Sequence, residues 1–136
     1  SLNDLHPALL SQLGSALSAF DAAMIELGVS DQVTAFTASD FGRTLTVNND
    51  GSDHGWGGMQ FVQGGAVNGQ RYYGTPPVVV HDGIDDVGQG RLLPTTATEQ
   101  VAATLGRWFG VSDSDLLTVL PNLANFDAGQ RNLGFV

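Results

Sequence analysis

The chain has 136 residues, is 42% hydrophobic and carries a net charge of −9, because fourteen acids outnumber five arginines and lysine is absent. This length suits a single domain over residues 1–136, with the composition of a globular protein. The acidic balance argues against nucleic acid and anionic membrane surfaces as partners. No apolar run approaches the ~20 residues that cross a bilayer, so we expect no membrane span. The absence of cysteine excludes disulfides and thiolate nucleophiles.

The first predicted element is a helix over residues 6–27. Its apolar residues recur at alternating spacings of three and four and form one stripe: Leu10, Leu13, Leu17, Phe20, Met24 and Leu27. Asn3 or Asp4 is placed to cap its start, and Gly28 follows its last apolar residue as a terminating glycine does. We expect the stripe to pack in the protein core.

The strands follow in short segments. Residues 33–38, "VTAFTA", predict a buried strand, and the order helix, loop, strand is half of a parallel α/β unit. Residues 59–67 predict a second strand, and "QRYYG" (70–74) and "GRLLP" (90–94) predict two more. The expected fold is therefore α/β, with a small, mostly parallel sheet flanked by helices.

Two helices are predicted in the C-terminal third. One covers residues 97–109, where Thr96 and Glu99 have capping-box spacing, and the other covers residues 113–120, where Ser112 is the cap. We expect the tail beyond them to cross the surface, with three apolar side chains fixing it to the protein: Phe126, Leu133 and Phe135.

Chemistry-bearing residues gather between residues 37 and 62, "TASDFGRTLTVNNDGSDHGWGGMQFV". Asp40 follows the first strand, at the edge where open α/β sheets bind ligands, and Arg43 shares its turn. Asp53 and His54 lie in a glycine-rich loop, and a carboxylate with an imidazole suits zinc, manganese or iron. The alternative is that Asp53 closes a turn and His54 is an ordinary polar residue. Trp56 either lines a sugar or aromatic subsite or packs on the core.

A second polar loop, "HDGIDDVGQG" (81–90), contains three acids and several glycines. Such a composition is compatible with calcium, but its spacing is not that of an EF-hand. A solvated turn is the better interpretation of this loop.

Five motifs in this order resemble the C-terminal part of an uncharacterised family of exported bacterial proteins. They are "FTASDFGRT", "DHGWGG", "GGAVNGQRYYGTPP", "GRLLPTTATEQVAATLGRWFGV" and "LPNLANF". That family usually carries twin-arginine signals and belongs to the alkaline phosphatase and sulfatase superfamily. The resemblance covers nearly the whole chain and implies a periplasmic, cell-surface or secreted location.

The resemblance also implies roles for single residues. The superfamily has a strand ending in an Asp-His pair that binds metal, which here matches Asp40 and, in place of the histidine, Phe41. His54 matches a further metal-binding histidine, and Asp53 either replaces the lost ligand or orients His54. Arg43 is a candidate anion contact. The implied cofactor is a divalent metal, with zinc as one candidate.

The superfamily's nucleophile and further acidic ligands come from an N-terminal part, for which we find no matching segment. The resemblance thus implies that the chain is the C-terminal portion of a metal-dependent phosphatase or sulfatase, incomplete alone. Its partners would be a phosphate or sulfate ester and the missing N-terminal part, with homo-oligomers possible through exposed apolar surface. The competing interpretation, supported by Phe41, is a non-catalytic binding or surface protein that kept the fold and lost the metal centre.

Overall fold

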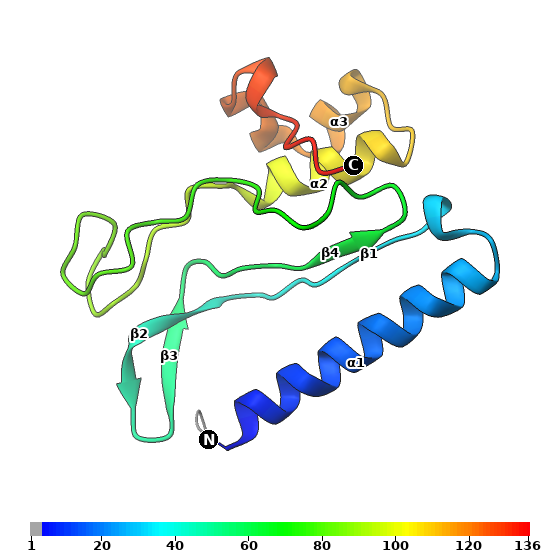
Figure 1. Ribbon diagram of the computed structural model, residues 1–136. Helices are drawn as coiled ribbons and strands as arrows, with labels where there is room; N and C mark the ends of the chain where they lie inside the picture. The colour runs from blue at the N-terminus through cyan, green and yellow to red at the C-terminus, as the bar shows by residue number, and fades with distance from the viewer. Residues whose placement is uncertain (1–3) are drawn as a thin grey trace. The chain divides into compact units, whose positions relative to one another are not determined.

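The computed structural model describes residues 4–136, and the chain divides into two compact units (Figure 1). The hairpin unit comprises Ser1–Val67 and Pro77–Leu93, and the helical unit comprises Asn68–Pro76 and Pro94–Val136. Each unit is described by itself below.

The hairpin unit contains two small antiparallel sheets. β1 (Thr34–Phe36) pairs with β4 (Val62–Gly64), and β2 (Gly42–Asn48) pairs with β3 (Gly51–Gly55). The predicted mostly parallel sheet is therefore wrong for the described residues. A parallel pair needs a crossover, usually a helix, to return the chain to the starting edge. Here the chain between β1 and β4 runs out and back as the β2–β3 hairpin, so β4 arrives antiparallel to β1.

The β2–β3 hairpin was not foreseen, because its residues were interpreted as a polar loop. Asn49 has a φ of 58° in the turn between the two strands. Asparagine tolerates this left-handed conformation better than most residues, and Asn/Asp-Gly sequences favour tight hairpin turns. In the sequence "RTLTVNNDGSD", residues alternate ahead of the turn, whose two central residues are Asn49 and Asp50, because Asn48 pairs with Gly51.

The first helix, α1 (Leu5–Glu26), is confirmed, and Gly28 follows it with a φ of 70°. Asp4 occupies the N-cap position without a side-chain cap hydrogen bond, and Asn3 lies outside the described residues. Figure 1 shows α1 running alongside β1 and β4, and Gln63 Nε2 of β4 donates to the Leu17 carbonyl at 2.9 Å.

The expectation that the α1 stripe is core is wrong, because no residue of α1 is buried. Within the stripe only Leu13, Leu17 and Met24 are half-buried. By length and composition alone α1 would be able to cross a membrane, a test that core helices and signal sequences also pass. The absence of a membrane span therefore stays a prediction.

Two predicted strands did not form. Residues 70–74 contain no strand, and in residues 90–94 only Leu92 makes an isolated antiparallel bridge, to Asp86.

The helical unit contains α2 (Thr98–Trp108) and α3 (Asp113–Val119), which confirms both predicted helices. Ser112 caps α3 as predicted, since its Oγ accepts the Asp115 N–H at 3.2 Å. The predicted Thr96 cap of α2 is wrong by one residue. Ala97 is the N-cap, and its N–H donates to Gln100 Oε1 at 2.9 Å. Two short 3₁₀ turns of this unit follow, at Pro121–Asn125 and Ala128–Gln130, and within residues 4–136 the hairpin unit has one more, at Ser30–Gln32.

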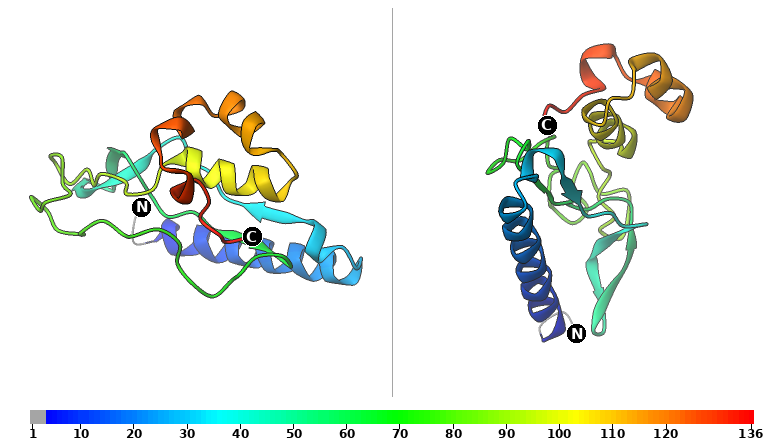
Figure 2. Two further views of the ribbon diagram at one scale, coloured as in Figure 1. Left: turned by 90° about the horizontal axis from the view of Figure 1, so that it is seen from above. Right: turned by 90° about the vertical axis from the view of Figure 1, so that its right-hand side faces the viewer.

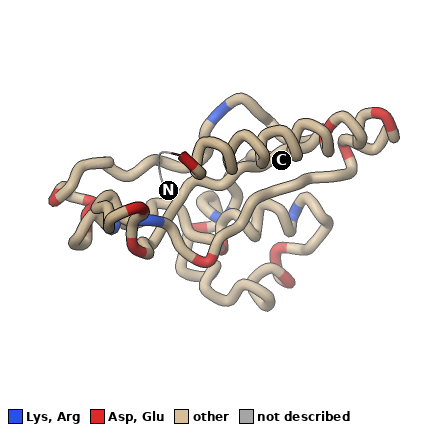
Figure 3. The backbone as a smooth tube through the Cα atoms, turned by 90° about the horizontal axis from the view of Figure 1, so that it is seen from below, with Lys and Arg blue, Asp and Glu red and all other residues tan. Residues whose placement is uncertain are grey.

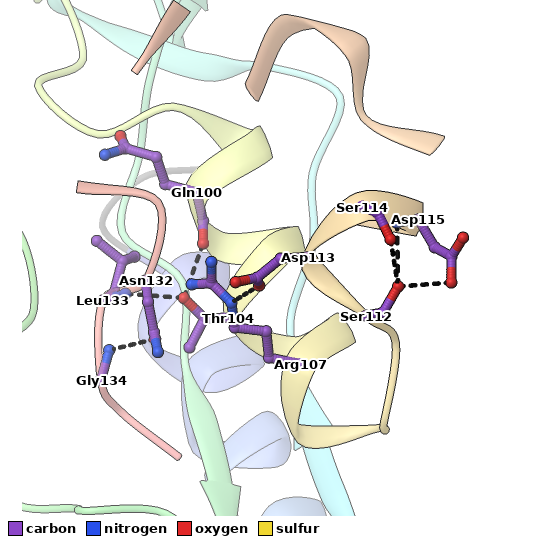
Figure 4. Close-up of polar contacts among 10 residues, drawn as sticks. All are labelled: Gln100, Thr104, Arg107, Ser112, Asp113, Ser114, Asp115, Asn132, Leu133 and Gly134. Carbon is purple, nitrogen blue, oxygen red and sulfur yellow. Dashed lines mark hydrogen bonds and ion pairs between the residues drawn. The ribbon is translucent and has the colours of Figure 1, made fainter. Parts of the chain in front are cut away.

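The core of the helical unit is built from residues of α2, α3, the 3₁₀ turn after α3 and the tail. Its buried hydrophobic side chains are Ala103, Leu116, Leu123 and Phe135. Figure 4 shows how Thr104 joins the tail to α2: its hydroxyl donates to the Gln100 carbonyl at 2.8 Å and accepts the Leu133 N–H at 2.9 Å. The tail is therefore anchored as expected, most firmly at Phe135, which is 3% exposed.

Candidate functional site

The β2–β3 hairpin brings together the two segments that carry the predicted site residues. Gly42 lies opposite Gly55, and Arg43 lies opposite His54. A Cβ atom at Gly42 would collide with the carbonyl oxygen of Gly57, so only glycine allows the two backbones to approach this closely. The glycines of "DFGR" and "HGWGG" thus serve the close packing of these segments.

Phe41 and His54 form a stacked pair at the base of this hairpin. Their ring centroids are 3.7 Å apart, with an angle of 15° between the ring planes. The Arg43 guanidinium carbon lies 5.0 Å from the Phe41 centroid, and Arg43 Nη1 donates to the Ser52 carbonyl at 2.6 Å. Position 41, where the resemblance places a metal-binding histidine, is therefore in direct contact with His54.

His54 is exposed, and within residues 4–136 no hydrogen bond reaches either nitrogen of its ring. Stacking covers one face of the imidazole but leaves its edge, which carries the nitrogens, accessible. The ring is thus able to donate an electron pair to an ion approaching in its plane.

Asp40 and Asp53 are placed differently relative to His54. Asp40 is exposed in the bend before β2 and immediately precedes Phe41, whose ring contacts His54. Asp53 neighbours His54 on β3, where successive side chains point to opposite faces. The Asp53 carboxylate accepts a hydrogen bond from the Asn48 amide, which ties together the two strands of the hairpin.

The remaining predicted residue, Trp56, follows β3 and is 67% exposed. A ring this exposed is not a core residue, so the interpretation in which Trp56 packs on the core is wrong for this conformation.

A different cluster, in the loop 81–90, brings potential metal ligands closest together. Ligand atoms of His81, Asp82 and Asp86 all lie within 4.8 Å of one another, and among the described residues Asp40, Asp53 and His54 form no group of that kind. His81 Nδ1 lies 2.9 Å from Asp82 Oδ2, and its Nε2 lies 3.1 Å from Thr46 Oγ1 of β2.

Asp86 organises this second loop through backbone contacts. Its carboxylate accepts N–H groups from Asp82 at 2.8 Å, Gly88 at 2.8 Å and Gly90 at 3.0 Å. The Asp82 N–H lowers the pKa of Asp86 most, desolvation opposes it, and the other two N–H groups and His81 add to the lowering. These contacts are those of a turn closed by a carboxylate, and nothing else in the loop indicates a bound ion.

As a metal site, the hairpin offers one imidazole, that of His54, while Asp40 immediately precedes the Phe41 ring that stacks on it. A structural or catalytic zinc needs at least three protein ligands. The hairpin therefore offers part of a ligand set, and Phe41 fills the position from which the resemblance expects another nitrogen.

A family model described as "Protein of unknown function (DUF1501)" matches residues 1–120. No curated protein and no solved structure matches the chain. The match agrees with the coarser part of the resemblance, an uncharacterised family, and the chain belongs to the DUF1501 family.

Proposed function

We propose that this chain is the C-terminal portion of a metal-dependent phosphatase- or sulfatase-like hydrolase that acts in the periplasm or at the cell surface. In such hydrolases a bound divalent metal, zinc for example, activates a nucleophile and stabilises charge developing on the transferring phosphoryl or sulfuryl oxygens. The remaining ligands and the nucleophile would come from the rest of the protein.

The observation that carries this proposal is the contact between positions 41 and 54. Two ligand positions from separate segments serve one metal only if the fold brings them together. The rings of Phe41 and His54 stack at 3.7 Å, so a side chain at position 41 and the His54 imidazole share one surface of the hairpin. Asp40 precedes this pair and would add a carboxylate oxygen.

Arg43 has the role of an anion contact in this proposal. Its guanidinium carbon lies 5.0 Å from the centroid of Phe41, whose ring stacks on His54, and the Ser52 carbonyl accepts a hydrogen bond from one of its nitrogens. The other N–H groups of the fork suit the oxygens of a phosphate or sulfate ester. In a chain of net charge −9, such a local cation is needed to offset repulsion of an anionic substrate.

The second candidate is a non-catalytic binding protein that retains the fold. Phe41 favours it, because a phenyl ring cannot ligate a metal and here it covers one face of His54. In that case the exposed Trp56 and the Phe41–His54 pair would serve as a contact surface for a partner or sugar.

Zinc titration of the chain, followed by NMR of its imidazole groups, tests the proposal directly. The chain has three histidines, His6, His54 and His81, so each imidazole is resolved individually. We expect Zn²⁺ to shift the His54 signals first, and His54→Ala to remove the binding. Shifts confined to His81, or absent at every histidine, would contradict a metal site at the hairpin.

A gain-of-ligand variant separates the two candidates. Phe41→His restores the nitrogen that the resemblance expects, and we expect it to tighten zinc binding on the order of tenfold or more. The matched control is Phe61→His, which also exchanges an exposed phenylalanine and should leave the affinity unchanged. Equal gains from both variants would point to adventitious binding. Assays of the full-length protein on aryl phosphates and aryl sulfates then test the hydrolase.

A further inference from the structure

Asn68 is the one asparagine of the chain that is followed by glycine, and every other asparagine precedes a larger residue. An asparagine closes to a five-membered cyclic imide when the main-chain nitrogen of the next residue attacks its side-chain carbonyl carbon. Glycine has no side chain to shield that nitrogen. Asn68 and Gly69 are both exposed, in a segment without helix or strand. The pair therefore has the composition and the setting in which this reaction occurs.

Asn68 also joins the C-terminal tail to residues 68–76 of the helical unit. Its N–H donates to the Phe135 carbonyl at 2.8 Å, and its Nδ2 donates to the Gly134 carbonyl at 3.3 Å. Its own carbonyl accepts the Tyr73 hydroxyl at 2.7 Å, and the rings of Tyr73 and Phe135 meet edge-on with centroids 5.8 Å apart. Figures 1 and 2 show the red tail ending beside the green segment that follows β4. A chemical change at position 68 thus acts directly on the tail.

Two further features of the pair favour imide formation. Within residues 4–136 the Gly69 N–H donates no hydrogen bond, so its nitrogen is not tied to another group. The Asn68 side chain makes one hydrogen bond to the described part of the chain, and its 3.3 Å is longer than the usual N–H···O length of about 2.9–3.0 Å. Rotation of this side chain toward Gly69 therefore breaks a single long contact.

We propose that Asn68 is a self-modifying site, which converts to aspartate and isoaspartate through a cyclic imide and thereby releases the C-terminal tail. The Gly69 nitrogen gives up its proton and attacks the Asn68 side-chain carbonyl carbon. A carbon–nitrogen bond forms, and the side-chain nitrogen takes up that proton and leaves as ammonia. Water then opens the imide at either of its two carbonyl carbons, which gives aspartate or isoaspartate. The reaction consumes one water and needs no oxidant, metal or second protein.

Both products remove the donor that Asn68 offers to the tail. An ionised carboxylate accepts hydrogen bonds and cannot donate, so it would face the Gly134 carbonyl oxygen with no proton between them. Isoaspartate also lengthens the main chain by one carbon and displaces the carbonyl that accepts the Tyr73 hydroxyl. No acid occurs in residues 68–76 or 128–136, and the C-terminal end of the tube in Figure 3 is not red. The new carboxylate is therefore the first acidic side chain in either segment.

Peptide mass spectrometry of the chain, incubated in warm, mildly alkaline buffer, tests the modification. We expect position 68 to gain the mass by which oxygen exceeds an NH group, while Asn48 and Asn49 of the same tryptic peptide stay unchanged. Gly69→Ala should stay unmodified over the same time, because a methyl group shields the attacking nitrogen. Gly129→Ala is the matched control, since a Cβ there meets no other atom, and it should convert like the unchanged chain. No mass gain at position 68, or an equal gain at Asn48 and Asn49, would overturn the proposal.

Asn68→Asp tests the release of the tail, because this variant supplies one product without waiting for the reaction. By NMR we expect the amide of residue 68 to exchange faster with solvent and the ring contact between Tyr73 and Phe135 to be lost. The Leu133 amide should keep its exchange rate, because its acceptor is the hydroxyl of Thr104 and not Asn68.

Asn122→Asp is the matched control for this variant. Asn122 is an exposed asparagine of the same unit, and its Nδ2 also donates to an oxygen, that of the Glu99 carboxylate at 3.1 Å. It should leave the amide of residue 68 unchanged. Equal effects of the two variants, or unchanged exchange at residue 68 in Asn68→Asp, would overturn the release of the tail. These outcomes are independent of zinc binding at His54.

Discussion

The helical unit and the hairpin unit differ in what fills their interiors. Every buried hydrophobic side chain among the described residues lies in the helical unit, at the four core positions named above. The buried residues of the hairpin unit are Thr44, Ser52 and Gly90, which are polar or lack a side chain. Several of its large apolar residues remain exposed, including Met59 at 81% and Phe61 at 54%. One unit therefore has a core, and the other is held mainly by its backbone pairing.

This difference shows that the hairpin unit leaves apolar surface exposed, whereas the helical unit buries it. A two-stranded sheet is marginally stable in water without a hydrophobic face or a helix packed on it. Here α1 is half-packed, and each intramolecular hydrogen bond contributes only about 1 kcal/mol net. Large apolar residues of this unit, such as Met59 and Phe61, therefore find no cover within it, whereas the helical unit buries a core of its own.

The largest expected effect comes from truncating a buried side chain in the core of the helical unit. Leu123 is 1% exposed, so Leu123→Ala should lower the free energy of unfolding of this unit by about 2–5 kcal/mol, through lost burial and a cavity. Met59→Ala, in the hairpin unit, should change it by less than about 0.5 kcal/mol. Urea unfolding followed by Trp108 fluorescence, in a Trp56→Phe background, reports on the helical unit alone.

An equal shift of the urea unfolding midpoint, followed by Trp108 fluorescence, in Met59→Ala and Leu123→Ala would contradict separate interiors. It would mean that the two units unfold together and that the hairpin unit shares the core.

A smaller effect is expected at the buried hydroxyl of Thr104. Thr104→Val keeps the shape but leaves the Leu133 N–H without its acceptor, which should cost about 1–3 kcal/mol. Thr118→Val is the control, because Thr118 also donates to a helix carbonyl, that of Ser114, but is exposed. Amide exchange at Leu133 should accelerate in Thr104→Val only. Unchanged exchange there would show that the tail is held by Phe135 without this hydrogen bond.

The sequence predicted the helical unit better than the hairpin unit, for a physical reason. Its helices begin and end at local signals, such as Ser112 before α3 and Gly110 after α2, and these act within one turn of the chain. The pairing of β1 with β4 depends on how the segment between them folds. A local hairpin signal exists at Asn49, but once its polar residues were interpreted as a loop, the antiparallel return of the chain was missed.

The same contrast applies to the site. The sequence placed Asp40 and His54 near each other from a resemblance, and the hairpin does bring Phe41, beside Asp40, onto His54. The stacking and the cross-strand register of Arg43 were not predictable without the hairpin. The cluster around Asp86 was noticed as an acidic loop, but its three backbone contacts depend on positions that the sequence does not specify.

The smallest expected effect concerns the loop 81–90 of the hairpin unit. The pKa of Asp86 is lowered in the folded chain from an ordinary value near 3.8, chiefly by the Asp82 N–H. A lowered pKa means that folding favours the carboxylate. Its contribution is therefore complete above pH 3.8 and is lost as the pH falls through the lowered value.

Amide spectra of Gly88 and Gly90 should accordingly stay constant from neutral pH to near pH 4 and change only below it. Asp86→Asn should alter both amides already at neutral pH and abolish the acid transition, because a neutral amide is a weaker acceptor for the N–H groups. Asp82→Asn is the matched control, since the Asp82 carboxylate pairs with His81 and not with these amides. If Asp82→Asn has the same effect as Asp86→Asn, the loop is held by the pair between Asp82 and His81 rather than by the Asp86 carboxylate.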